Sequence, residues 1–261
     1  MTLTLIHVAV ILCSIVIGAL ARHPASASDG IVIPLPPDDE KEITQQLGAG
    51  VVGRALPSQP VTDASKYFPL QERTLIYLVT AGENTGKLQP LAVAKGKRPD
   101  GNPAWRMALS PSQAGFIRQT STGDLIMPAV SDSGEGVIVF TNPANPFLLN
   151  GMQPGETRSL SQSVSVNYLD DPTSQDYSGS LTAEYTYVGT YQVTVPAGTY
   201  QAILARSKFE GKIGPAHTKD IAYYFFAPQV GVVAMISQED VEAFWVVHID
   251  TTSGKVLKSI D

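Results

Sequence analysis

Polar and apolar residues alternate along residues 160–168. Val164 and Val166 fall on one face of this segment, and a row of serines falls on the other. An alternation with a period of two predicts a β-strand that packs on one side and meets water on the other. Residues 181–187 repeat the pattern, and the polar stretch between the two runs, residues 170–180, predicts a hairpin loop.

Short apolar runs between turn residues recur along most of the chain. They predict further strands at residues 75–79, 88–94, 105–109, 115–119, 123–127 and 136–140. Residues 241–249 are apolar on both faces and predict one buried strand. No helical run of useful length intervenes, so the pattern is typical of an all-β protein. The chain has no internal repeat that would favour a propeller or a solenoid.

Two motifs near the C-terminus predict where the sheet turns. In Val-Pro-Ala-Gly-Thr-Tyr, residues 195–200, proline fixes φ and glycine allows a positive φ, which together predict a tight hairpin. The run Tyr-Tyr-Phe-Phe-Ala-Pro-Gln-Val-Gly-Val-Val, residues 223–233, predicts a strand with a corner or bulge at Pro228 and Gly231. The fold expected from all these signals is a strongly curved antiparallel sheet or a half-open β-barrel.

One short helix is predicted ahead of the sheet. It begins at Pro37, has an acidic first turn that suits a helix N-terminus, and ends near Gly48. The glycine-rich stretch 48–60 is interpreted as a linker or as a segment that lies against the sheet. We therefore expect a leader, helix and linker over residues 28–65 and a curved β domain over residues 66–261.

The N-terminus has the pattern of a secretory signal peptide. Residues 3–20 form a nearly continuous apolar run, and Ala25-Ser26-Ala27 follows as a cleavage site. Cleavage would leave a mature protein in the bacterial periplasm or outside the cell. The alternative is an uncleaved anchor, which would place Arg22 on the translocated side, against the positive-inside bias.

Cysteine usage and charge narrow the class of protein. The one cysteine, Cys13, lies in the apolar run, so the mature chain has neither a disulfide nor thiol chemistry. The net charge is −6, and the longest basic cluster is Lys95-Gly96-Lys97-Arg98. Nucleic-acid binding needs a larger basic footprint, so no nucleic-acid partner is expected. The mature domain is not expected to span a membrane.

Several motifs together resemble those of exported bacterial all-β proteins of largely unknown function, which include the DUF3108-like group. They are Tyr67-Phe68-Pro69-Leu70, residues 152–157 (Met-Gln-Pro-Gly-Glu-Thr), residues 195–200 and residues 227–233 (Ala-Pro-Gln-Val-Gly-Val-Val). The resemblance spans roughly residues 66–236 and implies a curved, barrel-like sheet similar in shape to periplasmic lipid carriers. The chain departs from that pattern at residues 71–74, where Gln-Glu-Arg-Thr replaces the usual Gly-x-x-Trp.

The sequence singles out no catalytic or metal site. It contains neither a G-x-S-x-G elbow nor an H-E-x-x-H motif. His217 and His248 are interpreted as a surface histidine and a histidine at the rim of the sheet. A paired-carboxylate glycosidase site is left open, but nothing selects a pair, and Glu184 and Glu210 lie on or beside predicted strands. We expect no cofactor, no metal and no enzymatic activity.

Aromatic residues concentrate in the last strands. Those proposed to contact an apolar or sugar ligand on the concave face are Tyr185, Tyr187, Tyr200, Tyr224, Phe226 and Trp245. The alternative is ordinary core packing. Residues 223–226 alternate across both faces of their strand, so half of them must point away from any one cavity.

The function expected from the sequence is a non-enzymatic envelope protein that binds an apolar ligand or a partner segment on its curved sheet. The first alternative is a structural or assembly protein that pairs through exposed strand edges. The second is a hydrolase, which would need His217 or His248 in a cleft within reach of a hydroxyl or carboxylate group.

Overall fold

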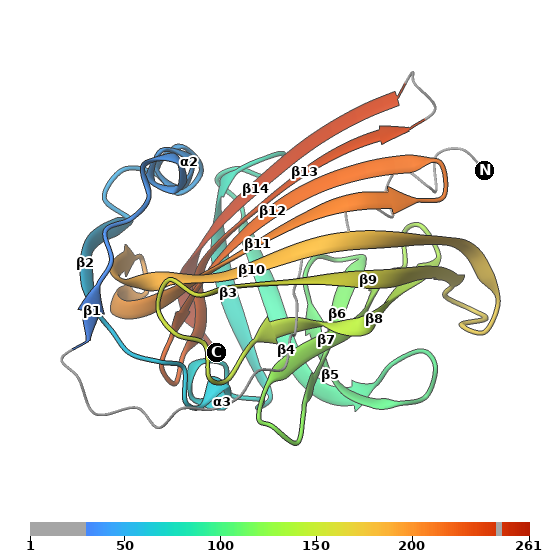
Figure 1. Cartoon of the computed structure of the whole chain (residues 1–261), viewed down its shortest axis with the longest axis horizontal. Helices are drawn as coiled ribbons and strands as arrows, with labels where there is room; N and C mark the ends of the chain where they lie inside the picture. Colours follow the sequence, from blue (N-terminus) through green and yellow to red (C-terminus); the bar gives the residue numbers. More distant parts are fainter. Residues whose placement is uncertain (1–29, 244–246) are drawn as a thin grey trace.

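The computed structural model describes residues 30–243 and 247–261, and its strands form one antiparallel barrel (Figure 1). The predicted signal segment, residues 1–27, and Trp245 lie outside the described residues. Within them, twelve consecutive strands from β3 to β14 pair in chain order, and the last strand pairs with the first to close the barrel. The prediction of an all-β antiparallel fold with a short N-terminal helix is confirmed. The described residues include no helix long and apolar enough to cross a membrane.

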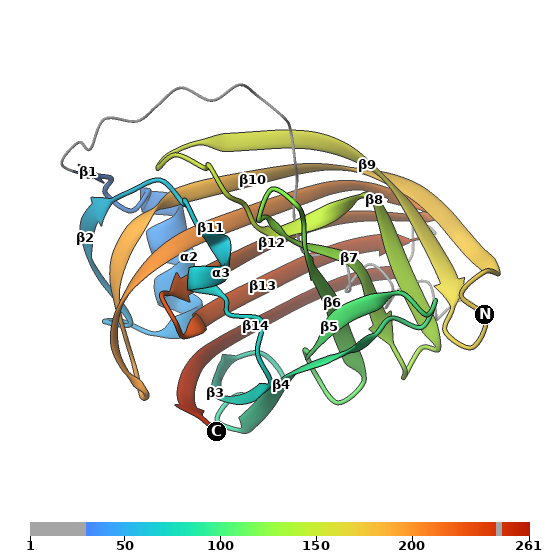
Figure 2. The ribbon, with the colours of Figure 1, turned by 90° about the horizontal axis from the view of Figure 1, so that it is seen from below.

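The barrel strands are longer in the second half of the chain than in the first. Strands of 6 to 12 residues come first: β3 (Arg73–Ala81), β4 (Leu88–Lys97), β5 (Pro103–Ala108), β6 (Gln113–Gln119), β7 (Leu125–Asp132) and β8 (Val137–Leu148). Strands of 12 to 21 residues follow: β9 (Thr157–Tyr168), β10 (Gln175–Val195), β11 (Gly198–Ile213), β12 (Ala216–Ala227), β13 (Gly231–Ala243) and β14 (Val247–Ile260). Figure 2 shows the long strands as a broad curved wall, with β5–β8 crossing on the opposite side.

The segment ahead of the barrel adds a helix to its outer surface and a strand to the end of β10. Helix α2 (Pro37–Leu47) matches the predicted helix and contacts β13, β14 and β3. Strand β2 (Val52–Ser58) pairs with β10 and carries the two-residue strand β1 (Ile31–Val32), so the glycine-rich stretch lies against the sheet. The short helix α3 (Ala64–Tyr67) was not predicted from the sequence. An N-cap residue marks the start of this helix: the side chain of Asp63 accepts a hydrogen bond from the backbone N–H of Ser65.

Aromatic side chains fill one part of the barrel interior. The ring of Phe147 lies 4.8 Å from that of Phe68 and 5.2 Å from that of Phe226, both edge to face. Tyr224 extends the cluster at 5.9 Å from Phe147. The hydroxyl of buried Tyr77 donates to the carbonyl of Val232, so this polar atom is satisfied inside the core.

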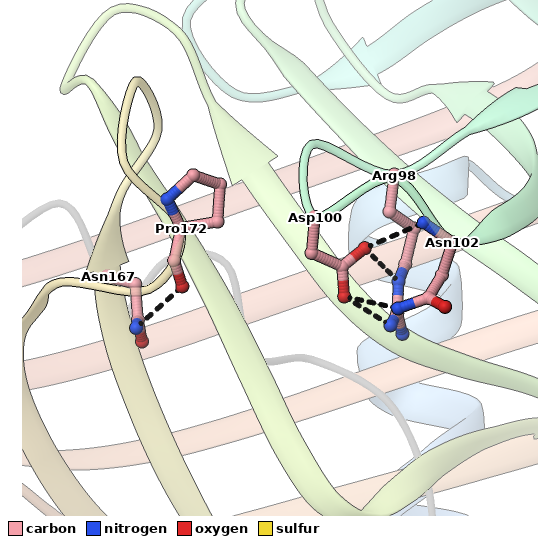
Figure 3. A network of polar contacts seen from close by, with 5 residues as sticks. All are labelled: Arg98, Asp100, Asn102, Asn167 and Pro172. Atoms are coloured by element: carbon pink, nitrogen blue, oxygen red, sulfur yellow. Dashed lines mark hydrogen bonds and ion pairs between the residues drawn. The ribbon is translucent and has the colours of Figure 1, made fainter.

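A second, smaller apolar cluster lies on the outer face of β5–β8, around Phe116 and Ile138. The β4–β5 loop reaches over it, and the guanidinium of Arg98 lies 5.6 Å from the ring centroid of Phe140. Asp100 holds this loop by accepting hydrogen bonds from Arg98 and Asn102, as Figure 3 shows. Figure 3 also shows Asn167 donating to the carbonyl of Pro172 in the neighbouring β9–β10 loop.

Two local predictions are wrong. Residues 241–249 are not one strand: β13 ends at Ala243, and β14 begins at Val247 and pairs back with it. Apolar residues at the end of one strand and the start of the next give a continuous apolar run in the sequence, as one buried strand does. The predicted corner at Pro228 is a full reversal, because residues 228–230 join β12 to β13. A register shift lies beside it at Phe225 and Phe226.

The Val-Pro-Ala-Gly-Thr-Tyr motif forms the hairpin that the sequence predicted. Strand β10 ends at Val195, and β11 begins at Gly198, which has a φ of +141°. The alternation at residues 223–226 is confirmed as well. Tyr224 and Phe226 face the aromatic cluster, whereas the hydroxyl of Tyr223 donates to Asp39 of α2 on the outside.

Candidate functional site

A cavity of about 1150 Å³ lies on the inner side of β13 and β14 and extends to the β3–β4 turn. Its origin is the unequal length of the strands where the barrel closes. Strand β14 begins at Val247, but its pairing with β3 begins only at Gly254. Residues 247–253 therefore have no partner on the β3 side among the described residues, and the wall is open beside the cavity.

Apolar side chains make up one part of the cavity lining. Tyr224 and Met235 are opposite each other on β12 and β13, and because paired residues of an antiparallel sheet share a face, both point inward. Val79 of β3 and Val130 of β7 line the cavity from the other side. This part of the interior can hold the apolar portion of a ligand.

Charged and hydroxyl side chains make up another part of the lining. Lys255 is opposite Met235, and Glu239 is opposite Thr251, so all four share the inner face of β13 and β14. The hydroxyl of Thr251 donates to Oε2 of Glu239 at 2.9 Å. Ser237 lies between Met235 and Glu239 on the same face.

Burial shifts the pKa of two charged groups in this lining, Glu239 and Lys255. It raises the pKa of Glu239 well above its ordinary value, and nearby Asp220 raises it further. Burial also lowers the pKa of Lys255, although the negative charge of Glu239 opposes that shift. Desolvation thus disfavours the charged form of each group.

Asp220 is opposite Glu239 across the β12–β13 ladder and is only 4% exposed. Its Oδ1 accepts a hydrogen bond from Thr218, but its buried Oδ2 has no hydrogen-bond partner among the described residues. Burial raises the pKa of Asp220 to about 8, and the charge of Asp240 adds to this shift. The hydroxyl of fully buried Ser207 on neighbouring β11 also has no hydrogen-bond partner among the described residues. A buried polar group without a partner lowers the stability of the fold.

The aromatic residues predicted to bind a ligand do not all lie together. Tyr185, Tyr187 and Phe226 are at most 2% exposed and belong to the packed core. Tyr200 donates its hydroxyl to the carbonyl of Ala197 beside the β10–β11 hairpin. Tyr224 lines the cavity. The predicted role of each in ligand binding remains a prediction, as does that of Trp245.

Both histidines lie on the outer face of the long strands. His217 is opposite Glu242, which in turn is opposite His248, and all three are exposed. Nδ1 of His248 lies 3.5 Å from Asp240 and 3.8 Å from Glu242, an arrangement of ligand types that could hold a metal ion. Neither histidine lines the cavity, so the geometry required for the hydrolase alternative is not found among the described residues.

Asp220 and Glu239 are buried acids that the apolar pattern of the sequence does not indicate. Glu184 and Glu210, the acids named from the sequence, are exposed. The signal for the missed pair was nevertheless present. Counting back in steps of two from Tyr224 places Asp220 on the inner face, and counting forward from Met235 places Glu239 there.

No family model and no curated protein matches the chain. A solved candidate lipoprotein from Parabacteroides distasonis ATCC 8503 is 14% identical, with 78% of this chain and 100% of that one covered and a TM-score of 0.38. A candidate exported protein with a YmcC-like fold from Bacteroides fragilis NCTC 9343 is 12% identical, with 78% and 99% covered and a TM-score of 0.36. Likenesses this distant carry no conclusion about function, and membership of the DUF3108-like group remains a prediction.

Proposed function

We propose that this protein is a non-enzymatic binding module of the bacterial cell envelope that holds an amphipathic small molecule inside its barrel. The cavity beside β13 and β14 is the observation that carries the proposal. Its volume of about 1150 Å³ is at or above the upper end of the range of small-molecule sites, which is about 300–1,000 Å³. The envelope location rests on the signal-peptide pattern at residues 1–27.

The lining of the cavity supports an amphipathic ligand. Val79, Val130 and Met235 offer apolar contacts, while Glu239 and Lys255 offer a small number of charged groups at one place. Binding sites for small molecules are typically apolar with a few convergent polar groups that fix orientation. A chain that needed only a stable core would gain little from buried charges, because they are costly to desolvate.

A variant that fills the cavity tests the proposal. Ser237 lies on the inner face and lines the cavity, so Ser237→Phe places a ring in the space that a ligand would use. We expect this variant to bind the apolar fluorescent probe N-phenyl-1-naphthylamine at least tenfold more weakly than the unchanged protein. The phenyl ring would reduce the volume of the cavity, while Glu239 and Lys255 would remain in its lining.

The matched control is Ser161→Phe, which makes the same substitution at an exposed position of β9. This variant should bind the probe as the unchanged protein does, and both variants should melt cooperatively in circular dichroism. Equal binding by all three proteins, or no binding by any of them, would contradict the proposal.

The assembly alternative retains one supporting observation, which is the edge of β14. Residues 247–253 offer backbone groups that no described strand pairs on the β3 side. Charged side chains at a strand edge oppose pairing with another chain, and His248 and Asp250 are both exposed there. Light scattering across a range of concentrations tests this alternative: edge pairing predicts dimers that Thr251→Pro abolishes, and the binding module predicts a monomer throughout.

A further inference from the structure

The charged groups of the cavity face the same space without pairing to each other. Lys255 and Glu239 interact electrostatically, but no ion pair within 4 Å joins them, although both are largely withdrawn from water. Buried charges in folded proteins are normally paired or hydrogen-bonded. Glu239 has the hydroxyl of Thr251 as a partner, whereas the side chain of Lys255 has neither a hydrogen bond nor an ion pair to any described residue. Both side chains line the cavity, so a polar group bound there could contact each of them.

The sheet register fixes the order of the two charges. Lys255 is beside Met235 and Tyr224, at the apolar part of the lining, and Glu239 lies four residues farther along β13. Asp220 stands behind Glu239 on β12 and adds a second carboxyl group. The cavity therefore has a basic side next to its apolar wall and an acidic side beyond it.

The unsatisfied atoms behind the acidic side are a separate observation. Oδ2 of Asp220 and Oγ of Ser207 are both buried and lack a partner among the described residues, and both side chains are on the inner face. A buried carboxyl group without a nearby cation keeps its proton to a higher pH. A ligand ammonium group at Glu239 would add a positive charge close to both carboxyl groups and would favour their ionised forms.

We propose that the polar end of the ligand is zwitterionic, with its anionic group at Lys255 and its ammonium group at Glu239. The inference rests on the proposed function and gives it a chemical class. The apolar tail then lies along Tyr224, Met235, Val79 and Val130. The exposed side chains Glu83 and Lys87 at the β3–β4 turn also line the cavity.

A matched set of four octyl compounds tests this assignment by isothermal titration calorimetry on the full mature protein. The set is octylphosphoethanolamine, octyl phosphate, octylamine and octanol, which share one tail and differ only in charge. We expect octylphosphoethanolamine to bind at least tenfold more tightly than each of the other three. This comparison uses the unchanged protein alone, so it does not depend on whether any variant folds.

Two variants then separate the two charges. Glu239→Gln should remove the advantage of octylphosphoethanolamine over octyl phosphate, and Lys255→Met should remove its advantage over octylamine. The matched controls are Glu242→Gln and Lys208→Met, which make the same changes at exposed positions on the outer face of β13 and β11. Both controls should preserve the ranking.

The outcomes distinguish this inference from the proposed function. If all four compounds bind equally, or if octyl phosphate or octylamine binds most tightly, the zwitterionic assignment is overturned while binding of N-phenyl-1-naphthylamine still supports an amphipathic ligand. If neither that probe nor any octyl compound binds, the proposed function fails together with the inference. A ranking that survives both Glu239→Gln and Lys255→Met would overturn the assignment of the two residues.

Discussion

At the scale of single residues, the most informative position is Asp220. Its carboxyl group occupies an inward strand position that an apolar residue would fill at no electrostatic cost. Thr218 donates one hydrogen bond to it, which satisfies one of its two oxygens. Asp220 should therefore lower the stability of the empty barrel at a pH where the group ionises.

The pH dependence of Asp220→Asn tests this cost. The pKa of Asp220 is about 8 in the folded protein against an ordinary value of 3.8, so between these pH values the folded state holds a proton that the unfolded state has released. Stability should therefore fall as pH rises through this window. Relative to the unchanged protein, Asp220→Asn should gain on the order of 2–4 kcal/mol at pH 9 and much less at pH 5.

Urea unfolding of both proteins at the two pH values measures the difference. Asp170→Asn, at an exposed loop position, serves as the control and should give the same small effect at both. If Asp220→Asn raises the free energy of unfolding by the same amount at both pH values, the destabilisation by Asp220 does not come from its ionisation.

At the scale of elements, a buried carboxylate is one of the contacts that hold α2 on the barrel, together with the hydrogen bond from Gln238 to Glu42. Both oxygens of Asp39 accept hydrogen bonds from Arg206 of β11, at 2.8 and 2.7 Å, and Tyr223 of β12 donates a third. Asp39 is 3% exposed, so its loss would leave a cation and a hydroxyl unpaired under the helix.

Asp39→Ala should lower the free energy of unfolding by about 2–3 kcal/mol, less than for a fully buried pair because the side chain of Arg206 is 20% exposed. Asp38→Ala is the control, since Asp38 is in the same first turn but exposed. It should change stability by no more than about 0.5 kcal/mol. Equal effects of the two variants in urea unfolding would mean that the buried contacts of Asp39 do not anchor α2.

The β12–β13 reversal depends on Gly231. Its φ of +99° is one that residues with a side chain rarely adopt, and a Cβ there would lie 2.9 Å from Nη2 of Arg73. Arg73 itself holds the turn by donating to the carbonyl of Val230 at 2.7 Å. The glycine therefore has both a conformational and a steric role.

Gly231→Ala should cost about 1–3 kcal/mol in thermal or urea unfolding. The same substitution at Gly96, where a Cβ would meet no atom within 4 Å, should change stability by no more than about 0.5 kcal/mol. A Gly231→Ala variant as stable as Gly96→Ala would refute this account of the turn.

At the scale of the whole molecule, the sequence predicted an antiparallel β fold, but it did not predict that the sheet closes into a barrel. The alternation of apolar and polar residues over 160–168 and 181–187 predicts two strands and the face that each buries. These residues lie in β9 and β10. The pairing of β14 with β3 joins residues far apart in the chain, and no local pattern encodes it. Prediction therefore stopped at a curved sheet or half-open barrel.

The candidate site was harder to predict for a related reason. The cavity exists because β14 extends beyond its pairing with β3, which is a consequence of closure. Of the aromatic residues expected at the site, Tyr224 lines it, whereas Tyr185 and Phe226 pack the core. Aromatic character alone does not separate these two environments, because each favours large apolar rings.

The central claim is that the barrel carries a small molecule in its cavity. Native mass spectrometry of the mature protein purified from its own host tests this most directly, with Ser237→Phe and Ser161→Phe prepared in the same way. The account predicts a bound species of a few hundred daltons on the unchanged protein and on Ser161→Phe, and its loss from Ser237→Phe. The bare mass for all three proteins, or the same adduct on all three, would contradict it.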